Sequence, residues 1–214
     1  MRGAVVFDLD GTLVASAPQI MGVANELLAG EGAAPLTLPE TVSFIGHGAR
    51  VFVQRMIAAR GLPDDAVDRL YHDFAARAES NAEGAGLFPG VAVALAALAE
   101  AGHPLGICTN KPAAPARAML DLLGIGHRFT ALVGGDSLPV LKPDPAPLHA
   151  AFAGLGAPFL YVGDSEVDFA TARAAGVPFA LFTRGYRRGG LGDFPGARIF
   201  DDWADFPTLV AGLA

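Results

Sequence analysis

The chain has a single cysteine, Cys108, among its 214 residues. One thiol cannot form an internal disulfide, and such a chain fits a reducing compartment. No apolar run approaches the roughly 20 residues that a membrane-spanning helix needs. The first strand-like run begins close to Met1, without the basic segment and apolar core of a signal peptide. We therefore expect a cytoplasmic protein that has no membrane partner.

Basic residues are also scarce. The 15 Lys and Arg are outnumbered by 22 Asp and Glu, so the net charge is −7. This balance argues against a nucleic-acid partner, although a few local cations could still bind a small anionic substrate. Lysine is the scarcer basic type, because only Lys111 and Lys142 occur. Lysine is a compact point charge where arginine is a planar fork, so these positions are candidate functional sites.

What the chain does have is a substantial apolar fraction. Hydrophobic residues make up 52% of the sequence, which is enough for a large buried core. Strand patterns occur near residues 5–7, 103–108, 131–133, 159–162 and 179–182, and helical patterns occur at 91–100, 112–124, 145–154 and 167–175. Short strands that alternate with helices of this length predict an α/β fold, with a mostly parallel, Rossmann-like sheet.

A long helical segment separates the first strand from the next. Helical periodicity covers 17–29, the segment from Arg50 to Gly61, and 63–82, with a proline-containing loop before Arg50. A plain crossover between parallel strands needs only about 30 residues, and this one is far longer. We therefore predict an inserted α-helical subdomain over residues 16–85, and a core formed by 1–15 and 86–214.

The first strand ends in two carboxylates. Asp8 and Asp10 lie one residue apart and are followed at once by Gly11. Side chains alternate along a strand, so both project to one side unless the chain turns between them. A cation would relieve the repulsion between two such charges. Taken alone, this stretch is better explained as an acidic turn after a strand, unless later strand ends supply a cation ligand, a phosphate-binding hydroxyl and a positive charge.

The next strand ends carry other polar groups. Thr109 and Asn110 precede a predicted helix, where backbone N–H groups favour an anion, although a helix N-cap also explains Thr109. Lys142 is restricted by the ring of Pro143 that follows it. We interpret a lysine held in such a rigid turn as a placed functional charge, and a solvated loop charge is the alternative.

An acidic pair follows the fourth predicted strand. Asp164 and Asp168 lie at the start of a predicted helix, and an acidic N-cap would explain one of them but not readily both. Carboxylate oxygens and water are the ligands that Mg²⁺ prefers. Ligands of parallel sheets bind at the carboxyl ends of the strands. The four strand ends together therefore predict one site with a nucleophile, an acid/base group, a phosphate-binding hydroxyl, a counter-charge and a metal.

This set of motifs resembles the haloacid dehalogenase (HAD) superfamily of phosphohydrolases over essentially the whole chain. The matching residues are Asp8-Leu9-Asp10-Gly11-Thr12-Leu13, Thr109, Lys142 with Pro143, and Gly163-Asp164-Ser165 with Asp168. The resemblance implies that the helical insertion is a small α-helical cap domain. Within the superfamily the chain is similar to bacterial phosphoglycolate phosphatases. The segments that carry this narrower similarity are Ile45-Gly46-His47-Gly48-Ala49, Phe88-Pro89-Gly90-Val91, Lys142-Pro143-Asp144-Pro145 and Gly185-Tyr186. Ala15 departs from the family pattern, where many relatives have Asp.

The resemblance also implies a reaction. Asp8 would attack phosphorus and form an aspartyl-phosphate, and Asp10 would protonate the leaving alkoxide and later activate water. Mg²⁺ would be bound by Asp8, by the backbone carbonyl of Asp10 and by Asp164. Asp168 would support the site from behind the metal ligands.

The same resemblance assigns the substrate contacts. Thr109, the Asn110 amide and Lys142 would bind the phosphoryl oxygens. Arg50, in the cap, is our expected partner for the carboxylate or other polar end of the substrate. Lys111 is expected only as an outer charge.

The expected function is Mg²⁺-dependent hydrolysis of a small phosphorylated metabolite, with 2-phosphoglycolate as the first choice, by a monomer or a homodimer. Alternatives on the same core are a phosphatase for another small sugar or organic-acid phosphate and a phosphomutase. A phosphonate hydrolase is disfavoured because neither lysine lies in the cap. Outside the enzymes, a receiver-like phospho-binding module would be about half this length, and an inactive scaffold would not keep every catalytic position.

Overall fold

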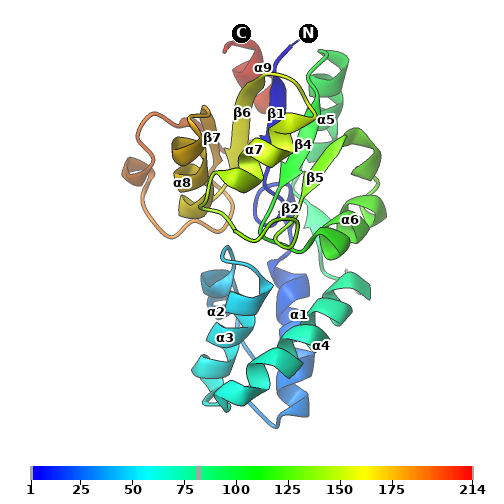
Figure 1. The fold of residues 1–214 in the computed structure, drawn as a ribbon, viewed down its shortest axis with the longest axis vertical. Coiled ribbons are helices and arrows are strands. Elements are labelled where there is room, and N and C mark those ends of the chain that lie inside the picture. Colours follow the sequence, from blue (N-terminus) through cyan, green and yellow to red (C-terminus); the bar gives the residue numbers. More distant parts are fainter. Residues whose placement is uncertain (1, 81–82, 214) are drawn as a thin grey trace.

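The structure, a computed structural model, describes residues 2–80 and 83–213. Two parts follow one another along the long axis of the molecule (Figure 1). One part contains the sheet and both ends of the chain, and the other contains helices α1 to α4. The cleft between them holds the site described below.

A six-stranded sheet forms the centre of the α/β part, in the order β5-β4-β1-β6-β7-β8. Its strands are β1 (Ala4–Phe7), β4 (Leu105–Cys108), β5 (Ala131–Val133), β6 (Pro158–Gly163), β7 (Phe179–Phe182) and β8 (Arg198–Phe200). All neighbouring strands in it run parallel. The predicted α/β fold with a parallel sheet is therefore confirmed. From β1 the chain first adds β4 and β5 toward one edge, and then adds β6, β7 and β8 toward the other edge. The strand order therefore reverses between β1 and β6. Open parallel sheets bind ligands at such a switch point.

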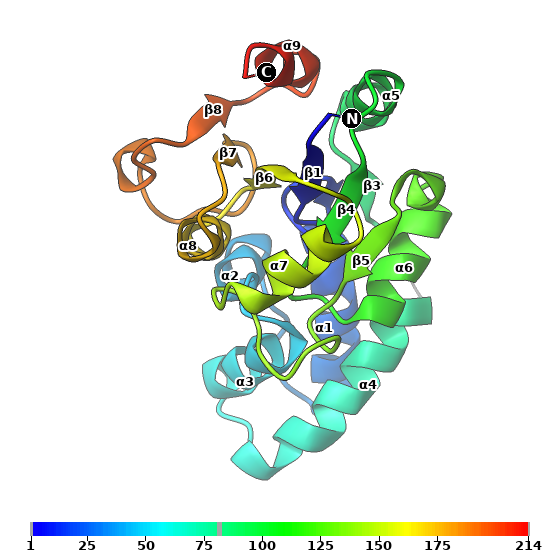
Figure 2. The ribbon, with the colours of Figure 1, turned by 45° about the horizontal axis from the view of Figure 1, so that its top comes forward.

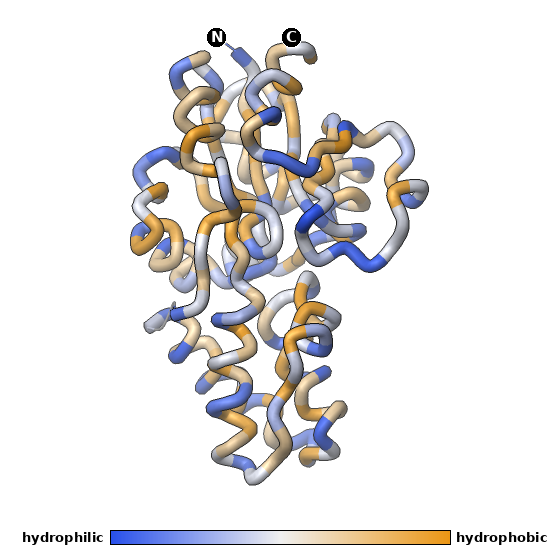
Figure 3. Tube along the Cα trace, turned by 180° about the vertical axis from the view of Figure 1, so that it is seen from behind, coloured by the Kyte–Doolittle hydropathy of each residue, from blue (hydrophilic) through white to orange (hydrophobic). Residues whose placement is uncertain are grey.

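Helices cover both faces of this sheet (Figure 2). One face packs against α5 (Val91–Glu100), α6 (Ala113–Leu122) and α9 (Phe206–Ala211), and the other against α7 (Ala146–Ala153) and α8 (Glu166–Ala175). The residues of β1, β4 and β7 are all buried, as continuous apolar runs are in a sheet covered on both sides. Apolar strands accordingly run through the middle of this part (Figure 3).

The helical part has a hydrophobic core of its own. It consists of α1 (Ala17–Gly30), α2 (Leu38–Phe44), α3 (Ala49–Arg60) and α4 (Val67–Ser80). Their apolar faces meet in one cluster, in which Leu28, Val53 and Met56 are fully buried. Helix α2 replaces the predicted loop. Thr37 and Glu40 form a capping box at its start and Pro39 lies in its first turn, where proline is tolerated.

Two short strands connect the parts. Strand β2 (Val14–Ala15) pairs antiparallel with β3 (Gly86–Leu87), so both chain crossings lie in one ribbon. Ala15 and Gly86, which border the predicted boundaries at 15/16 and 85/86, pair with each other in this ribbon.

Other predicted elements differ at their ends. The predicted helix over 63–82 is a 3₁₀ turn at Asp64–Ala66 followed by α4, and residues 81 and 82 lie outside the described part. Two more 3₁₀ turns, Gly126–Arg128 and Leu191–Asp193, connect elements of the α/β part. Within the described ranges, no helix combines the length and hydropathy that crossing a bilayer requires.

Candidate active site

A cavity of about 480 Å³ lies between the carboxyl ends of the strands and the helical part. The α/β part contributes polar and charged side chains to its wall: Asp8, Asp10, Thr109, Asn110, Lys111, Lys142, Asp164, Ser165, Glu166, Asp168, Tyr186 and Arg188. The wall from the helical part is mostly apolar, and consists of Ile20, Ile45, Gly46, His47, Gly48, Ala49, Phe52, Phe74, Ala75 and Ala78. The strand-end residues predicted from sequence thus share one cavity, whereas Arg50, predicted in the cap, does not line it.

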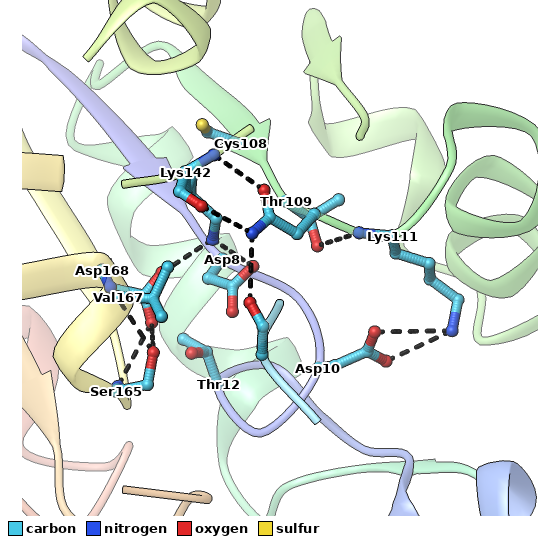
Figure 4. Close-up of polar contacts among 12 residues, drawn as sticks. Asp8, Asp10, Thr12, Cys108, Thr109, Lys111, Lys142, Ser165, Val167 and Asp168 are labelled. Atoms are coloured by element: carbon cyan, nitrogen blue, oxygen red, sulfur yellow. Dashed lines mark hydrogen bonds and ion pairs between the residues drawn. The ribbon is translucent and has the colours of Figure 1, made fainter. Parts of the chain in front are cut away.

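Asp8 and Lys142 form a buried ion pair at the centre of the site (Figure 4). The Lys142 Nζ atom lies 2.8 Å from Asp8 Oδ1, and both side chains are almost fully buried. Burial raises the pKa of Asp8 to about 7, even though the Lys142 charge lowers it. Burial alone would lower the pKa of Lys142, but the charges of Asp168 and Asp8 hold it well above its ordinary value. Lys142 is therefore a permanent positive charge beside Asp8.

Asp10 points to a different cation. Its carboxylate oxygens lie 3.3 and 3.5 Å from Lys111 Nζ, on the side of the site away from Lys142 (Figure 4). The Lys111 side chain is only 7% exposed. The sequence predicts Lys111 only as an outer charge, and in the structure this side chain lies in the cavity wall beside Asp10. The two carboxylates of the first motif are therefore paired with two different lysines.

Asp164 is held by two donors from other parts of the chain. Its carboxylate accepts hydrogen bonds from Thr12 Oγ1, at 2.7 Å, and from the backbone N–H of Tyr186. Burial, together with the charges of Asp168 and Asp8, raises the pKa of Asp164 well above its usual range. Gly11 allows this approach, because it has φ +85° and an added Cβ would lie 2.5 Å from Asp164 Oδ2.

Asp168 supports Lys142. Its Oδ1 accepts hydrogen bonds from Lys142 Nζ at 2.7 Å and from the Tyr161 hydroxyl at 2.9 Å. Its Oδ2 accepts one from Ser165 Oγ at 2.6 Å, as part of the capping box that starts α8. Although burial opposes ionisation, Lys142 lowers the pKa of Asp168 below its ordinary value. The oxygens of Asp168 are thus committed to protein donors.

Three of these carboxylates are close enough to share one cation. One oxygen from each of Asp8, Asp164 and Asp168 lies within 4.8 Å of the others. Burial and the neighbouring negative charges raise the pKa values of Asp8 and Asp164. A divalent cation would offset this cost, and carboxylate oxygen is the donor that Mg²⁺ favours. The residues present therefore fit a hard divalent metal.

Asn110 has a task that the sequence did not suggest. Its side-chain amide accepts a hydrogen bond from the Lys142 N–H at 2.9 Å and donates to the Lys142 carbonyl at 3.0 Å. It also donates to the carbonyl of Gly46 in the helical part, at 3.0 Å. The predicted use of this side chain as a phosphate ligand is therefore corrected, because both of its polar atoms are hydrogen-bonded to backbone groups. Thr109, which lines the cavity, accepts a hydrogen bond from the Lys111 N–H at 3.2 Å.

Arg50 does not reach the cavity, which corrects the prediction that it binds substrate. It lies on α3, and its guanidinium pairs with Asp68 on α4 and stacks over the ring of Tyr71. Its side chain is 53% exposed. The face of α3 that approaches the site begins instead at Gly48 and Ala49.

Sequence reasoning missed three supporting residues, Thr12, Tyr161 and Tyr186. The Tyr161 hydroxyl accepts a hydrogen bond from Lys142 Nζ at 2.9 Å, and the Tyr186 hydroxyl accepts one from the backbone N–H of Ala17 at 2.8 Å. Thr12 lies within the first motif and Tyr186 within the Gly185-Tyr186 segment, and these were the available signals. The contacts of the two tyrosines depend on strand register and loop path, which the local sequence does not reveal.

Comparison with known proteins adds independent information. The family model of haloacid dehalogenase-like hydrolases matches residues 5–182. A phosphoglycolate phosphatase of Cereibacter sphaeroides is 48% identical over 213 residues, which cover 98% of each chain. A protein of the same name from Rhodobacter capsulatus is 43% identical over 99% of this chain and 98% of its own. The crystal structure of a "predicted phosphoglycolate phosphatase" from Haemophilus somnus 129PT superposes with a TM-score of 0.89 at 32% identity, over 96% of both chains.

Proposed function

This chain is a phosphatase that belongs to the haloacid dehalogenase-like hydrolase family, and we propose that its substrate is 2-phosphoglycolate. The substrate assignment is supported by relatives named phosphoglycolate phosphatase, which are 43–48% identical to this chain over nearly its whole length. The observation that carries the mechanism is the buried Asp8–Lys142 pair at the sheet switch point, with Asp164 at the end of the adjacent strand.

Asp8 is the proposed nucleophile. Its carboxylate would attack phosphorus, the bond from phosphorus to the ester oxygen would break, and an aspartyl-phosphate would form. The Lys142 charge, 2.8 Å from Asp8 Oδ1, would stabilise the negative charge on the phosphoryl oxygens. The Thr109 hydroxyl accepts from the Lys111 N–H, which leaves its own hydrogen for a phosphoryl oxygen.

Asp10 is the proposed acid and base. In the first step it would protonate the departing alkoxide, and in the second it would take a proton from the water that hydrolyses the aspartyl-phosphate. This use of two nearby carboxylates needs different surroundings for each. Both carboxylates line the cavity, but Asp8 is paired with Lys142 whereas Asp10 is paired with Lys111.

Asp8 and Asp164, with the backbone carbonyl of Asp10, are the proposed Mg²⁺ ligands. When bound, the ion would screen the anionic nucleophile from the anionic phosphate. Asp168 is excluded from this set because its oxygens accept hydrogen bonds from Lys142, Tyr161 and Ser165. Its proposed role is to orient Lys142.

The helical part is the proposed cap. It closes one side of the cavity, and its apolar wall would limit the access of water while the aspartyl-phosphate exists. The β2–β3 ribbon carries both connections to it, so motion of the cap would occur about this ribbon.

A phosphate-release assay over a panel of small phosphate esters, with and without Mg²⁺, tests the proposal. We expect Mg²⁺-dependent release with 2-phosphoglycolate among the best substrates. A stronger preference for sugar phosphates would overturn the substrate assignment and leave the chemistry intact. Release that is unaffected by removal of divalent metal would overturn the metal assignment.

A further inference from the structure

We propose that the ammonium group of Lys111 binds the carboxylate of the substrate and so selects phosphate esters of short α-hydroxy acids. This inference rests on the proposed function and deepens it, because correction of the Arg50 assignment leaves the carboxylate without a partner.

Three lysine or arginine side chains line the cavity in the described part of the chain: Lys111, Lys142 and Arg188. Lys142 is committed, since its Nζ atom is within 2.9 Å of both Asp8 and Asp168. Arg188 is exposed, and its guanidinium donates to the Ser43 carbonyl at 2.6 Å. Lys111 is therefore the inward-facing cation that remains for an anionic ligand.

The existing pair of Lys111 is loose. Its distances to Asp10, 3.3 and 3.5 Å, exceed the 2.7–2.9 Å of a good charge-assisted hydrogen bond. Only 7% of its side chain is nevertheless exposed, and a buried charge is costly unless it is well paired. An ammonium group has three donors, so Lys111 can bind a substrate carboxylate without leaving Asp10.

The position of Lys111 fits the shape of such a substrate. In 2-phosphoglycolate, one methylene group separates the ester oxygen from the carboxylate carbon. Asp10 is the proposed proton donor to that ester oxygen, and Lys111 lies directly beside Asp10. When the ester oxygen lies at Asp10, the carboxylate of 2-phosphoglycolate, one methylene group away, would therefore lie near Lys111. A longer acid would carry its carboxylate past this cation.

The helical part supplies no competing permanent charge. Among its described residues that line the cavity, His47 is the one titratable group, and the others are apolar residues and glycines. Burial, with the charges of Arg55 and Arg188, lowers the pKa of His47, so its ring is neutral at pH 7.

The test compares two substrates that differ only in the carboxylate. These are 2-phosphoglycolate and 2-hydroxyethyl phosphate, in which a neutral CH₂OH group replaces the carboxylate. We expect Lys111→Met to lower kcat/KM for 2-phosphoglycolate by roughly 10²-fold, chiefly through KM, because a charge-assisted hydrogen bond is lost. The neutral ester should change by less than about threefold. Lys111→Arg keeps the charge and should retain part of the preference, which also guards against a folding defect in Lys111→Met.

Arg50→Met is the matched control, because it removes one positive charge outside the cavity. It should leave the ratio of the two kcat/KM values at the wild-type level. An equal loss on both substrates in Lys111→Met would show that Lys111 only orients Asp10, and would overturn the inference alone. A wild-type enzyme without preference for 2-phosphoglycolate would overturn the proposed substrate, and the carboxylate site with it.

Discussion

At the scale of single residues, the site depends on two carboxylates that the fold places in different surroundings. Both line the cavity, but Asp8 is paired with Lys142 and Asp10 with Lys111. Removal of the Asp8 charge should therefore have a different effect from removal of the Asp10 charge. In the proposed mechanism Asp8 alone performs the covalent step.

Asp8→Asn should lower kcat by roughly 10⁴-fold or more, because an amide cannot act as the nucleophile. The measurement is phosphate release at saturating 2-phosphoglycolate and Mg²⁺. Asp73→Asn, an exposed change on α4, is the matched control and should keep wild-type activity. Substantial turnover by the Asp8 variant would contradict the assignment.

The raised pKa of Asp8 predicts how Mg²⁺ binding depends on pH. In the metal-free protein this carboxyl has a pKa of about 7, so it holds a proton at lower pH that a cation must displace. Apparent Mg²⁺ affinity should thus rise as the pH rises from 6 to 8, with proton release that calorimetry can measure. Affinity that is constant over this range would show that Asp8 is already ionised or is not a ligand.

The same shift has a consequence for stability. Because its folded-state pKa is raised above the ordinary value, Asp8 stabilises the metal-free fold fully below about pH 3.8, and this contribution is lost as the pH rises through about 7. Mg²⁺ should therefore raise Tm more at pH 8 than at pH 6. Thermal scans with and without the ion, at both pH values, make the comparison.

The Asn110 amide should matter through Lys142. Asn110→Ala removes its bonds to the Lys142 backbone and to Gly46, so we expect kcat to fall by about 10- to 10²-fold together with a loss of stability of about 1–3 kcal/mol. Asn25→Ala is a close control, because the Asn25 amide makes a similar pair of bonds to the Leu36 backbone within the helical part. It should lower stability and leave kcat unchanged, and equal effects on kcat would contradict the positioning role.

At the scale of elements, the start of α1 is tied to the catalytic core by one side chain. The Ala17 N–H donates to the Tyr186 hydroxyl at 2.8 Å, next to the β2–β3 ribbon. Tyr186→Phe should lower stability by about 1 kcal/mol and speed amide hydrogen exchange in the peptide that contains Ala17. Tyr71→Phe on α4 is the control. Unchanged exchange at Ala17 would show that this bond does not restrain the helix.

Elements with a strong local pattern could be predicted from the sequence. Strands β5 and β7 have the predicted bounds, because each is an apolar run enclosed by polar or turn residues. Strand β8 was missed because it is three residues long and two of them are exposed. Helix α2 was missed because Pro35 and Pro39 suggested a loop, although Thr37 and Glu40 form a capping box there.

The site was predictable where its residues follow strands directly, because parallel strands bring their carboxyl ends to one edge. Its supporting contacts were not. The pairing of Tyr161 with Lys142 follows from how β6 lies beside β1, and Arg50 was misplaced because the sequence does not show which face of α3 meets the cavity.

At the scale of the whole molecule, the two parts have separate hydrophobic cores joined by one ribbon. Trp203, the single tryptophan, is buried in the α/β part, so its fluorescence reports that part alone. Met56→Ala should destabilise the helical part by about 2–5 kcal/mol. On heating, the helical part of this variant should then unfold at a lower temperature, followed by circular dichroism, than the α/β part, followed by Trp203 fluorescence. Coincident transitions that shift together would show that the parts unfold as one unit.

The most direct test of the central claim is to trap the aspartyl-phosphate. The enzyme is quenched during turnover of 2-phosphoglycolate with Mg²⁺ and reduced with borohydride, which converts an acyl phosphate to an alcohol, and its peptides are analysed by mass spectrometry. The account predicts substrate-dependent conversion of Asp8 to homoserine, with Asp10 and Asp164 unchanged. Conversion of another carboxylate, or turnover that proceeds with no conversion at Asp8, would contradict it.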